Sequence, residues 1–140
     1  MRLGYNSIMA KVAIIEDDQA ISQLYRMKFE GEGFQVETAA GGQLGLELAE
    51  KMQPDIVLLD ITMPDMSGYQ VLAKIRESDW GKNLKVVILT NRSEQEVGDT
   101  VRNLGVSAVI VKAMMTPRHV VNMVQSLLGV SPPSAPAQAA

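Results

Sequence analysis

The chain has 140 residues, of which 46% are hydrophobic and 21% charged, which is the balance of one globular domain with a substantial core. Its 13 Lys and Arg residues against 16 Asp and Glu residues give a formal net charge of -3 without any basic block, which argues against direct nucleic-acid binding. Cysteine is absent, so disulfides, thiolate nucleophiles and zinc-thiolate sites are excluded.

The two ends of the chain lack the pattern of a folded element. Residues 1–10 are too weakly apolar for a secretory signal, and no apolar run approaches the roughly 20 residues that span a bilayer. We therefore expect a soluble, cytoplasmic protein with an N-terminal extension over residues 1–10 and one domain over residues 11–129. The Pro- and Ala-rich residues 130–140 are expected to be disordered, either as a free tail or as the stub of a linker.

The first predicted strand, residues 11–15, is an apolar run that leads into the acids Glu16, Asp17 and Asp18. Asp18 is better placed to cap the next helix, residues 19–30, than to act as a ligand. The three acids therefore mark the end of a buried strand, and only the first two are candidates for chemistry.

An alternating segment at residues 34–39 predicts an edge strand, and a helical segment after it is closed by Pro54. The third strand, residues 56–59, carries four aliphatic residues straight into Asp60. A single acid in this place is better explained as a cap or a turn residue, so Asp60 becomes a candidate for chemistry only if the other strands also end in polar residues.

The fourth predicted strand, residues 85–89, follows a helix over residues 69–77 and ends at Thr90. Ser93, with a glutamate three residues later, forms a capping-box pattern that predicts a fourth helix running to about Leu104.

The fifth predicted strand, residues 108–111, ends at Lys112. Thr116 as N-cap and Pro117 as first helical residue begin the last helix, and His119 in its first turn is assigned to the surface. Met114 and Met115 fit either an adaptable contact surface or the filling of a gap beside that helix.

Five strands that alternate with five helices imply a doubly wound parallel α/β sheet of the flavodoxin-like (βα)5 type, with strand order 2-1-3-4-5. The carboxyl ends of parallel strands meet at one edge of the sheet, where ligands bind. The polar residues expected to converge there are Glu16, Asp17, Asp60, Thr90 and Lys112.

This set of side chains suits a phosphoryl group. Carboxylates held close together repel unless a cation joins them, and oxygen ligands favour a hard ion such as Mg2+. Lys112 and the Thr90 hydroxyl add a positive charge and a hydrogen-bond donor, which can neutralise the oxygens of a transferring phosphoryl group. The attacking oxygen would belong to Asp60, which would form an aspartyl phosphate.

The chain resembles the receiver domain of two-component response regulators over residues 11–129. The motifs that carry the resemblance are Ile14-Ile15-Glu16-Asp17-Asp18, Pro54-Asp55-Ile56-Val57-Leu58-Leu59-Asp60, Met63-Pro64-Asp65-Met66-Ser67-Gly68, Val87-Ile88-Leu89-Thr90 and Lys112.

The resemblance implies a signalling domain that catalyses only its own phosphorylation and dephosphorylation. Asp60 would be the phosphoacceptor for a sensor histidine kinase or a phosphotransfer protein, and Asp17, Asp60 and the backbone carbonyl of Thr62 would bind Mg2+ directly. Glu16 would act through water, Thr90 would turn towards the phosphoryl group and Lys112 would pair with it. A downstream protein partner would bind the fourth helix, the fifth strand and the fifth helix.

Three positions depart from the family pattern. Val109 stands where receiver domains usually carry an aromatic residue, and Ala113 stands where the lysine is usually followed by proline. Asn91 is larger than the small residue that commonly follows the threonine. A non-proline cis bond costs about 2.5–4 kcal/mol, so the Lys112–Ala113 bond is expected to be trans.

Two other interpretations remain. A receiver-like interaction module that is never phosphorylated is suggested by Val109 and Ala113. A Mg2+-dependent aspartyl-phosphate phosphatase of the haloacid type would need a second acid two residues after the nucleophile, where this chain has Thr62. Asp65, between Pro64 and Gly68, is assigned to a plain loop carboxylate.

Overall fold

A five-stranded parallel sheet in the order β2-β1-β3-β4-β5 forms the middle layer of the molecule. The structure is a computed structural model that describes residues 10–92 and 94–130. The predicted strand order and flavodoxin-like fold are confirmed. The strands are β1 (Lys11–Ile15), β2 (Gln35–Ala39), β3 (Ile56–Asp60), β4 (Lys85–Thr90) and β5 (Ala108–Val111).

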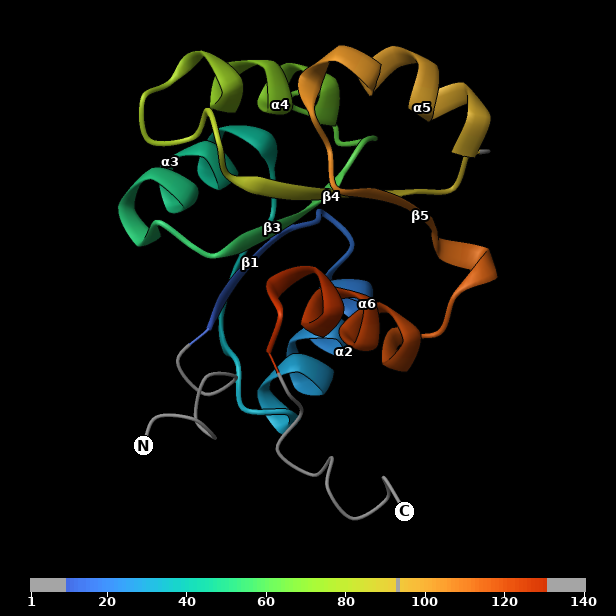
Figure 1. Cartoon of the computed structure of the whole chain (residues 1–140). Helices are drawn as coiled ribbons and strands as arrows, with labels where there is room; N and C mark the ends of the chain where they lie inside the picture. The colour runs from blue at the N-terminus through green and yellow to red at the C-terminus, as the bar shows by residue number, and fades with distance from the viewer. Residues whose placement is uncertain (1–9, 93, 131–140) are drawn as a thin grey trace.

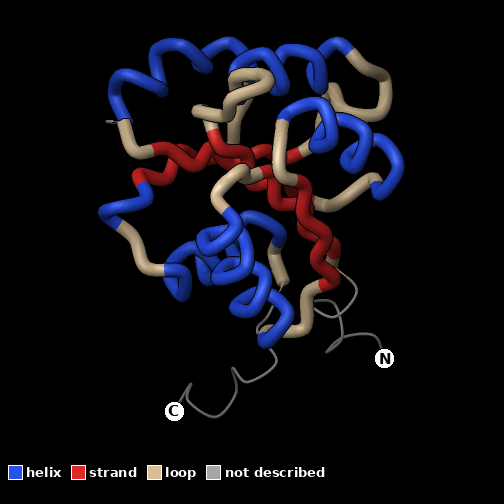
Figure 2. Tube along the Cα trace, turned by 180° about the vertical axis from the view of Figure 1, so that it is seen from behind, coloured by secondary structure: helices blue, strands red, loops and turns tan. Residues whose placement is uncertain are grey.

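Helices cover both faces of the sheet (Figure 1). The helical elements are α2 (Gln19–Gly31), α3 (Gly42–Met52), α4 (Gly68–Glu77), α5 (Glu94–Val101), η2 (Arg102–Leu104), η3 (Lys112–Met114) and α6 (Pro117–Leu128). Helices α2 and α6 lie together on one face, and α3, α4 and α5 lie on the other; the view from behind shows the same two layers (Figure 2).

Two apolar clusters bind these layers to the sheet. On one face, Phe29 of α2 and Val124 of α6 pack against alternate residues of β1, β3 and β4. On the other face, Leu72 of α4 and Val97 of α5 pack against the intervening residues of the same strands. Side chains of a strand point alternately to opposite faces, so a central strand in this architecture must be apolar throughout. Only the strand ends are then free to carry polar groups to the sheet edge.

Helices α2 and α6 begin at the side-chain caps that the sequence predicted. Asp18 Oδ1 accepts a hydrogen bond from Ile21 N at 3.0 Å, and Thr116 Oγ1 accepts one from His119 N at 3.2 Å. Each oxygen satisfies one of the backbone N–H groups that a helix start leaves unpaired. The assignment of Asp18 to a cap is thereby supported by geometry.

Two strands are one residue longer than predicted, because β3 includes Asp60 and β4 includes Thr90. The fourth helix is shorter than predicted: α5 ends at Val101, and the last turn before Gly105 is 3-10. Arg76 Nε donates a hydrogen bond to the Leu104 carbonyl at 2.6 Å, so a carbonyl of this 3-10 turn is paired with a side chain. The predicted cap of this helix at Ser93 lies outside the described residues.

The expected extension and tail also lie outside the described residues, except for their inner ends. Ala10 is buried, and its carbonyl accepts a hydrogen bond from Gln35 N at 2.9 Å. No helix within residues 10–92 and 94–130 has the length and apolar character that crossing a membrane requires.

Candidate functional site

Two buried acids stand at the carboxyl ends of the adjacent strands β1 and β3. Glu16 follows β1 directly and is 1% exposed, and Asp60, the last residue of β3, is 4% exposed. Glu16 N donates to the Ala39 carbonyl at 3.0 Å, which continues the β1–β2 pairing as far as the acid. The aliphatic strands thus carry both carboxylates to one edge of the sheet, as the sequence predicted.

Asp17 completes a group of three carboxylates. One carboxylate oxygen from each of Glu16, Asp17 and Asp60 lies within 4.8 Å of the other two. Hard divalent cations such as Mg2+ take oxygen ligands, and the group offers no nitrogen or sulfur atom. These residues therefore fit such an ion by donor type and by spacing.

Lys112 reaches the same place from the end of β5. Its Nζ lies 2.7 Å from Glu16 Oε1 and 3.5 Å from Asp60 Oδ1, and its side chain is 11% exposed. The lysine therefore bridges the two buried acids and partly balances their charge, with the shorter contact to Glu16. The sequence predicted its presence at the site but not this preference.

The acid pair makes ionisation of Asp60 unfavourable. Burial and the nearby negative charge of Glu16 raise the pKa of Asp60 from 3.8 to about 7, against the opposing effect of Lys112. Burial alone lowers the pKa of Lys112, but its hydrogen bond to Glu16 and the charge of Asp60 outweigh this and raise it. Without a further cation, the site holds more negative charge than one lysine balances.

The two threonines are placed differently. Thr62 N donates to Asp60 Oδ1 at 3.2 Å, so the loop after β3 contacts the acid directly. Thr90 is 1% exposed, and its Oγ1 accepts a hydrogen bond from Arg92 N at 2.8 Å. Thr90 follows Leu89, the register partner of Asp60, and within the described part of the chain its hydroxyl makes no bond to the acids.

The departures from the family pattern lie in β5 and directly after β4 and β5. Val109 is half-buried and packs against the cluster under α3, α4 and α5. Ala113 is exposed in the 3-10 turn that Lys112 begins, and all peptide bonds of the described residues are trans. Asn91 is exposed directly after β4.

Asp65 is not a plain loop carboxylate, and that prediction was wrong. Its Oδ1 accepts from Gly42 N at 2.9 Å and its Oδ2 from Gln43 N at 3.1 Å, so it caps α3 from 22 residues or more along the chain. These two bonds lower the pKa of Asp65. Gly41, the N-cap residue of α3, has no side chain that could accept these hydrogen bonds. A glycine at this position was therefore the signal in the sequence that a residue from elsewhere in the chain caps the helix.

Comparison with known proteins identifies the family. A sequence model of the response regulator receiver domain matches residues 12–125. The chain belongs to this family. Receiver domains are signalling domains, and the match indicates no enzyme family.

Two relatives show how much of a longer protein this receiver domain matches. It is 34% identical over 113 residues to the phosphate regulon transcriptional regulatory protein PhoB of Rhizobium meliloti, covering 79% of this chain and 48% of that protein. It is 40% identical over 98 residues to the cell cycle response regulator CtrA of Brucella ovis, covering 70% of this chain and 40% of that protein. The chain thus spans about half or less of the length of these relatives.

Solved structures share the fold over most of the chain. Chemotaxis protein CheY4 of Vibrio cholerae matches with a TM-score of 0.79 at 28% identity, covering 84% of this chain and 98% of that one. Response regulator TrrA of Thermotoga maritima, solved in complex with Mg(2+)-BeF, matches with a TM-score of 0.74 at 26% identity, covering 85% and 99%.

Proposed function

We propose that this receiver domain is the phosphoacceptor of a two-component phosphorelay, in which Asp60 takes a phosphoryl group from a sensor histidine kinase or a phosphotransfer protein. The observation that carries the proposal is the Glu16, Asp17 and Asp60 group with Lys112 bridging two of its members. A structural role gives no reason to crowd these charges at one buried edge.

The contacts of Asp60 support Oδ2 as the attacking oxygen. Thr62 N and Lys112 Nζ both approach Oδ1, which leaves Oδ2 without a contact from either. In the proposed step, Oδ2 attacks phosphorus in line with the donor nitrogen, the P–O bond forms and the P–N bond breaks. The bonding pair of the P–N bond stays on the donor imidazole.

The remaining residues would stabilise the phosphorylated state. Asp17, Asp60 and the Thr62 carbonyl would hold Mg2+, with Glu16 acting through water; the bound ion supplies charge neutralisation for the carboxylates and phosphoryl oxygens. Lys112 would leave part of its Glu16 contact and pair with the new phosphoryl charge. The Thr90 oxygen already accepts from Arg92 N, so its hydroxyl proton is available to donate to a phosphoryl oxygen. The presence of Mg2+ in the TrrA complex supports this assignment.

The phosphorylated form would shift a pre-existing equilibrium and alter a protein-binding surface on α5, β5 and α6, within a domain spanning residues 11–129. This would take place in the cytoplasm, without direct contact to nucleic acid or membrane. Val109 cannot perform an aromatic rotamer change on this surface, and this favours one alternative: a receiver-like module that binds its partner without phosphorylation.

Incubation with Mg2+ and acetyl phosphate, read by intact-protein mass spectrometry, tests the proposal. We expect one phosphoryl adduct on the wild type, and none on Asp60→Asn or without Mg2+. An exposed carboxylate, changed by Asp79→Asn, provides the matched control and should keep the adduct. Absence of the adduct from a folded wild type would favour the binding module, and sustained release of phosphate from small esters would favour a phosphatase.

A further inference from the structure

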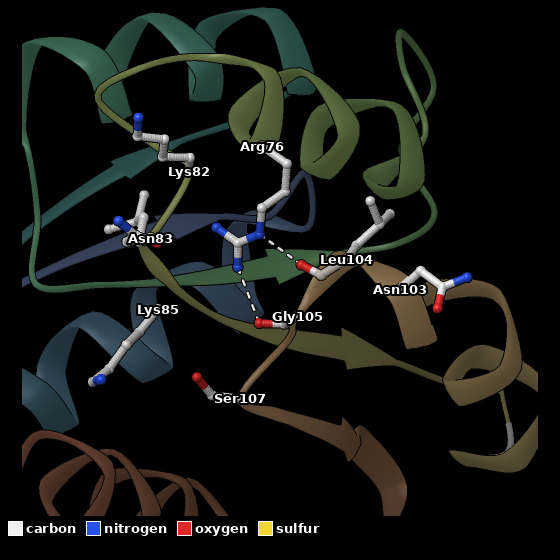
Figure 3. Close-up of a pocket in the computed structure, with 9 residues that line it drawn as sticks. Arg76, Lys82, Asn83, Lys85, Asn103, Leu104, Gly105 and Ser107 are labelled. Carbon is white, nitrogen blue, oxygen red and sulfur yellow. Dashed lines mark hydrogen bonds between the residues drawn. The ribbon is translucent and has the colours of Figure 1, made fainter.

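A polar concavity lies at the end of the sheet opposite to Asp60. It has a volume of about 430 Å³ and is formed where β4 and β5 begin, beside the end of α4. Figure 3 shows one wall made by the segment that enters β4, another made by the segment that enters β5, and the Arg76 guanidinium between them. The lining residues are Arg76, Lys82, Asn83, Leu84, Lys85, Asn103, Leu104, Gly105 and Ser107.

The charge of this hollow opposes the charge of the chain. Of the described residues that line it, Arg76, Lys82 and Lys85 are cationic and none is acidic, whereas the chain carries a net charge of -3. Within the described residues, no carboxylate forms an ion pair with any of the three. Their charge is therefore left to solvent or to a ligand, and a concave wall concentrates the field of like charges.

Arg76 is held in place but retains donors. Its Nε donates to the Leu104 carbonyl at 2.6 Å, Nη1 to the Gly81 carbonyl at 2.8 Å and Nη2 to the Gly105 carbonyl at 3.1 Å. A guanidinium has five N–H bonds, so one remains on each of Nη1 and Nη2. Its partners are neutral and burial lowers its pKa, so its positive charge gains from an anion beside it.

The rest of the lining selects the kind of anion. Among the described residues, no aromatic side chain lines the hollow and Leu84 and Leu104 are its only large apolar residues, so a nucleobase or other ring finds no stacking partner there. The side chains of Asn83 and Ser107 add an amide and a hydroxyl donor to the lining. Recognition would thus be directed at oxygens.

We propose that this hollow binds a small polyanion with two or more phosphate groups. A tetrahedral phosphate offers oxygens in several directions at once, which suits cations on two walls, whereas a planar carboxylate presents both oxygens to one side. The volume lies in the range of small-ligand pockets, about 300–1,000 Å³. Lys82 and Lys85 are exposed, so their flexible stems can bring both ammonium groups to the ligand. The site is independent of the proposed phosphorylation of Asp60.

Calorimetric titration of the full chain with sodium pyrophosphate, without Mg2+ and at constant ionic strength, tests the proposal. We expect saturable binding that becomes about tenfold weaker in a Lys82→Ser, Lys85→Ser double variant, because two charge-assisted contacts are lost. The control variant, Lys28→Ser with Lys51→Ser, removes two exposed lysines elsewhere and should bind as the wild type does.

Amide chemical-shift mapping locates the binding. We expect shifts at Gly105 and Ser107 in both the wild type and Asp60→Asn. Shifts confined to the Lys112 region, equal weakening in the two double variants, or absence of saturation would each overturn the proposal. Citrate that binds as tightly as pyrophosphate would overturn the assignment to phosphate, and a poly-glutamate peptide that binds where pyrophosphate does not would show a protein-docking surface instead.

Discussion

The cost of ionising Asp60 in the folded, metal-free protein should be measurable as a gain in stability on Asp60→Asn. The pKa of Asp60 is raised from 3.8 to about 7, so between these values the folded protein holds a proton that the unfolded chain has lost. Stability therefore falls as the pH rises through this range and levels off above the folded pKa. Below both values the acid is neutral in both states, and this cost disappears.

The magnitude follows from the width of that range. Each pKa unit corresponds to about 1.36 kcal/mol, so the roughly two units between pH 5 and the folded pKa correspond to at most about 2.7 kcal/mol. Asparagine keeps the hydrogen bond to Thr62 N but removes the ionisation. We therefore expect the advantage of Asp60→Asn over wild type to be about 2 kcal/mol larger near pH 8 than near pH 5.

Urea unfolding in the presence of a chelator, at both pH values, provides the assay. The exposed Asp79→Asn serves as control and should track the wild type at both pH values. An advantage of Asp60→Asn that is equal at the two pH values, or larger near pH 5, would refute the argument that burial and Glu16 hold Asp60 protonated.

Three further perturbations test the geometry around the site. Lys112→Ala leaves Glu16 buried without its cation and should lower the free energy of unfolding by about 3 kcal/mol; an unchanged value by urea titration would contradict the bridging role. Asp65→Ala removes both caps of α3, so the unfolding temperature and the hydrogen-exchange protection of the first amides of α3 should fall, and retained protection would contradict the cap. Gly68→Ala places a methyl group against the backbone at the end of β3 and should lower the free energy of unfolding by about 3 kcal/mol. Gly98→Ala in α5 meets open space and should raise the free energy of unfolding by up to about 1 kcal/mol. Equal effects of the two variants in thermal unfolding would refute this contrast.

The strands and their polar ends could be predicted because the signal is local. Each central strand is an apolar run bounded by turn residues, and β3 leads through Leu58 and Leu59 directly into Asp60. The rules of parallel α/β topology then bring the carboxyl ends together without any knowledge of distances. The convergence of the acids and Lys112 followed from these two steps.

The rest depends on contacts between distant residues. The cap that Asp65 provides joins the loop after β3 to α3, and only the absence of a side chain at Gly41 hinted at it. Lys112 Nζ lies closer to Glu16 than to Asp60, and the spacing of these residues along the sequence does not determine that difference in distance. The basic hollow combines segments around residues 76, 82–85 and 103–107, none of which forms a charge run of its own.

The contact between Lys112 and Glu16 also bears on the order in which the site is assembled during synthesis. The two residues are 96 positions apart, and during synthesis all three acids of the site emerge long before the lysine. Until β5 docks against β4, the acids lack their only cation among the described residues. The acids therefore gain this partial charge compensation only when the sheet is complete, and a chain truncated before β5 would present Glu16 and Asp60 without the lysine that bridges them.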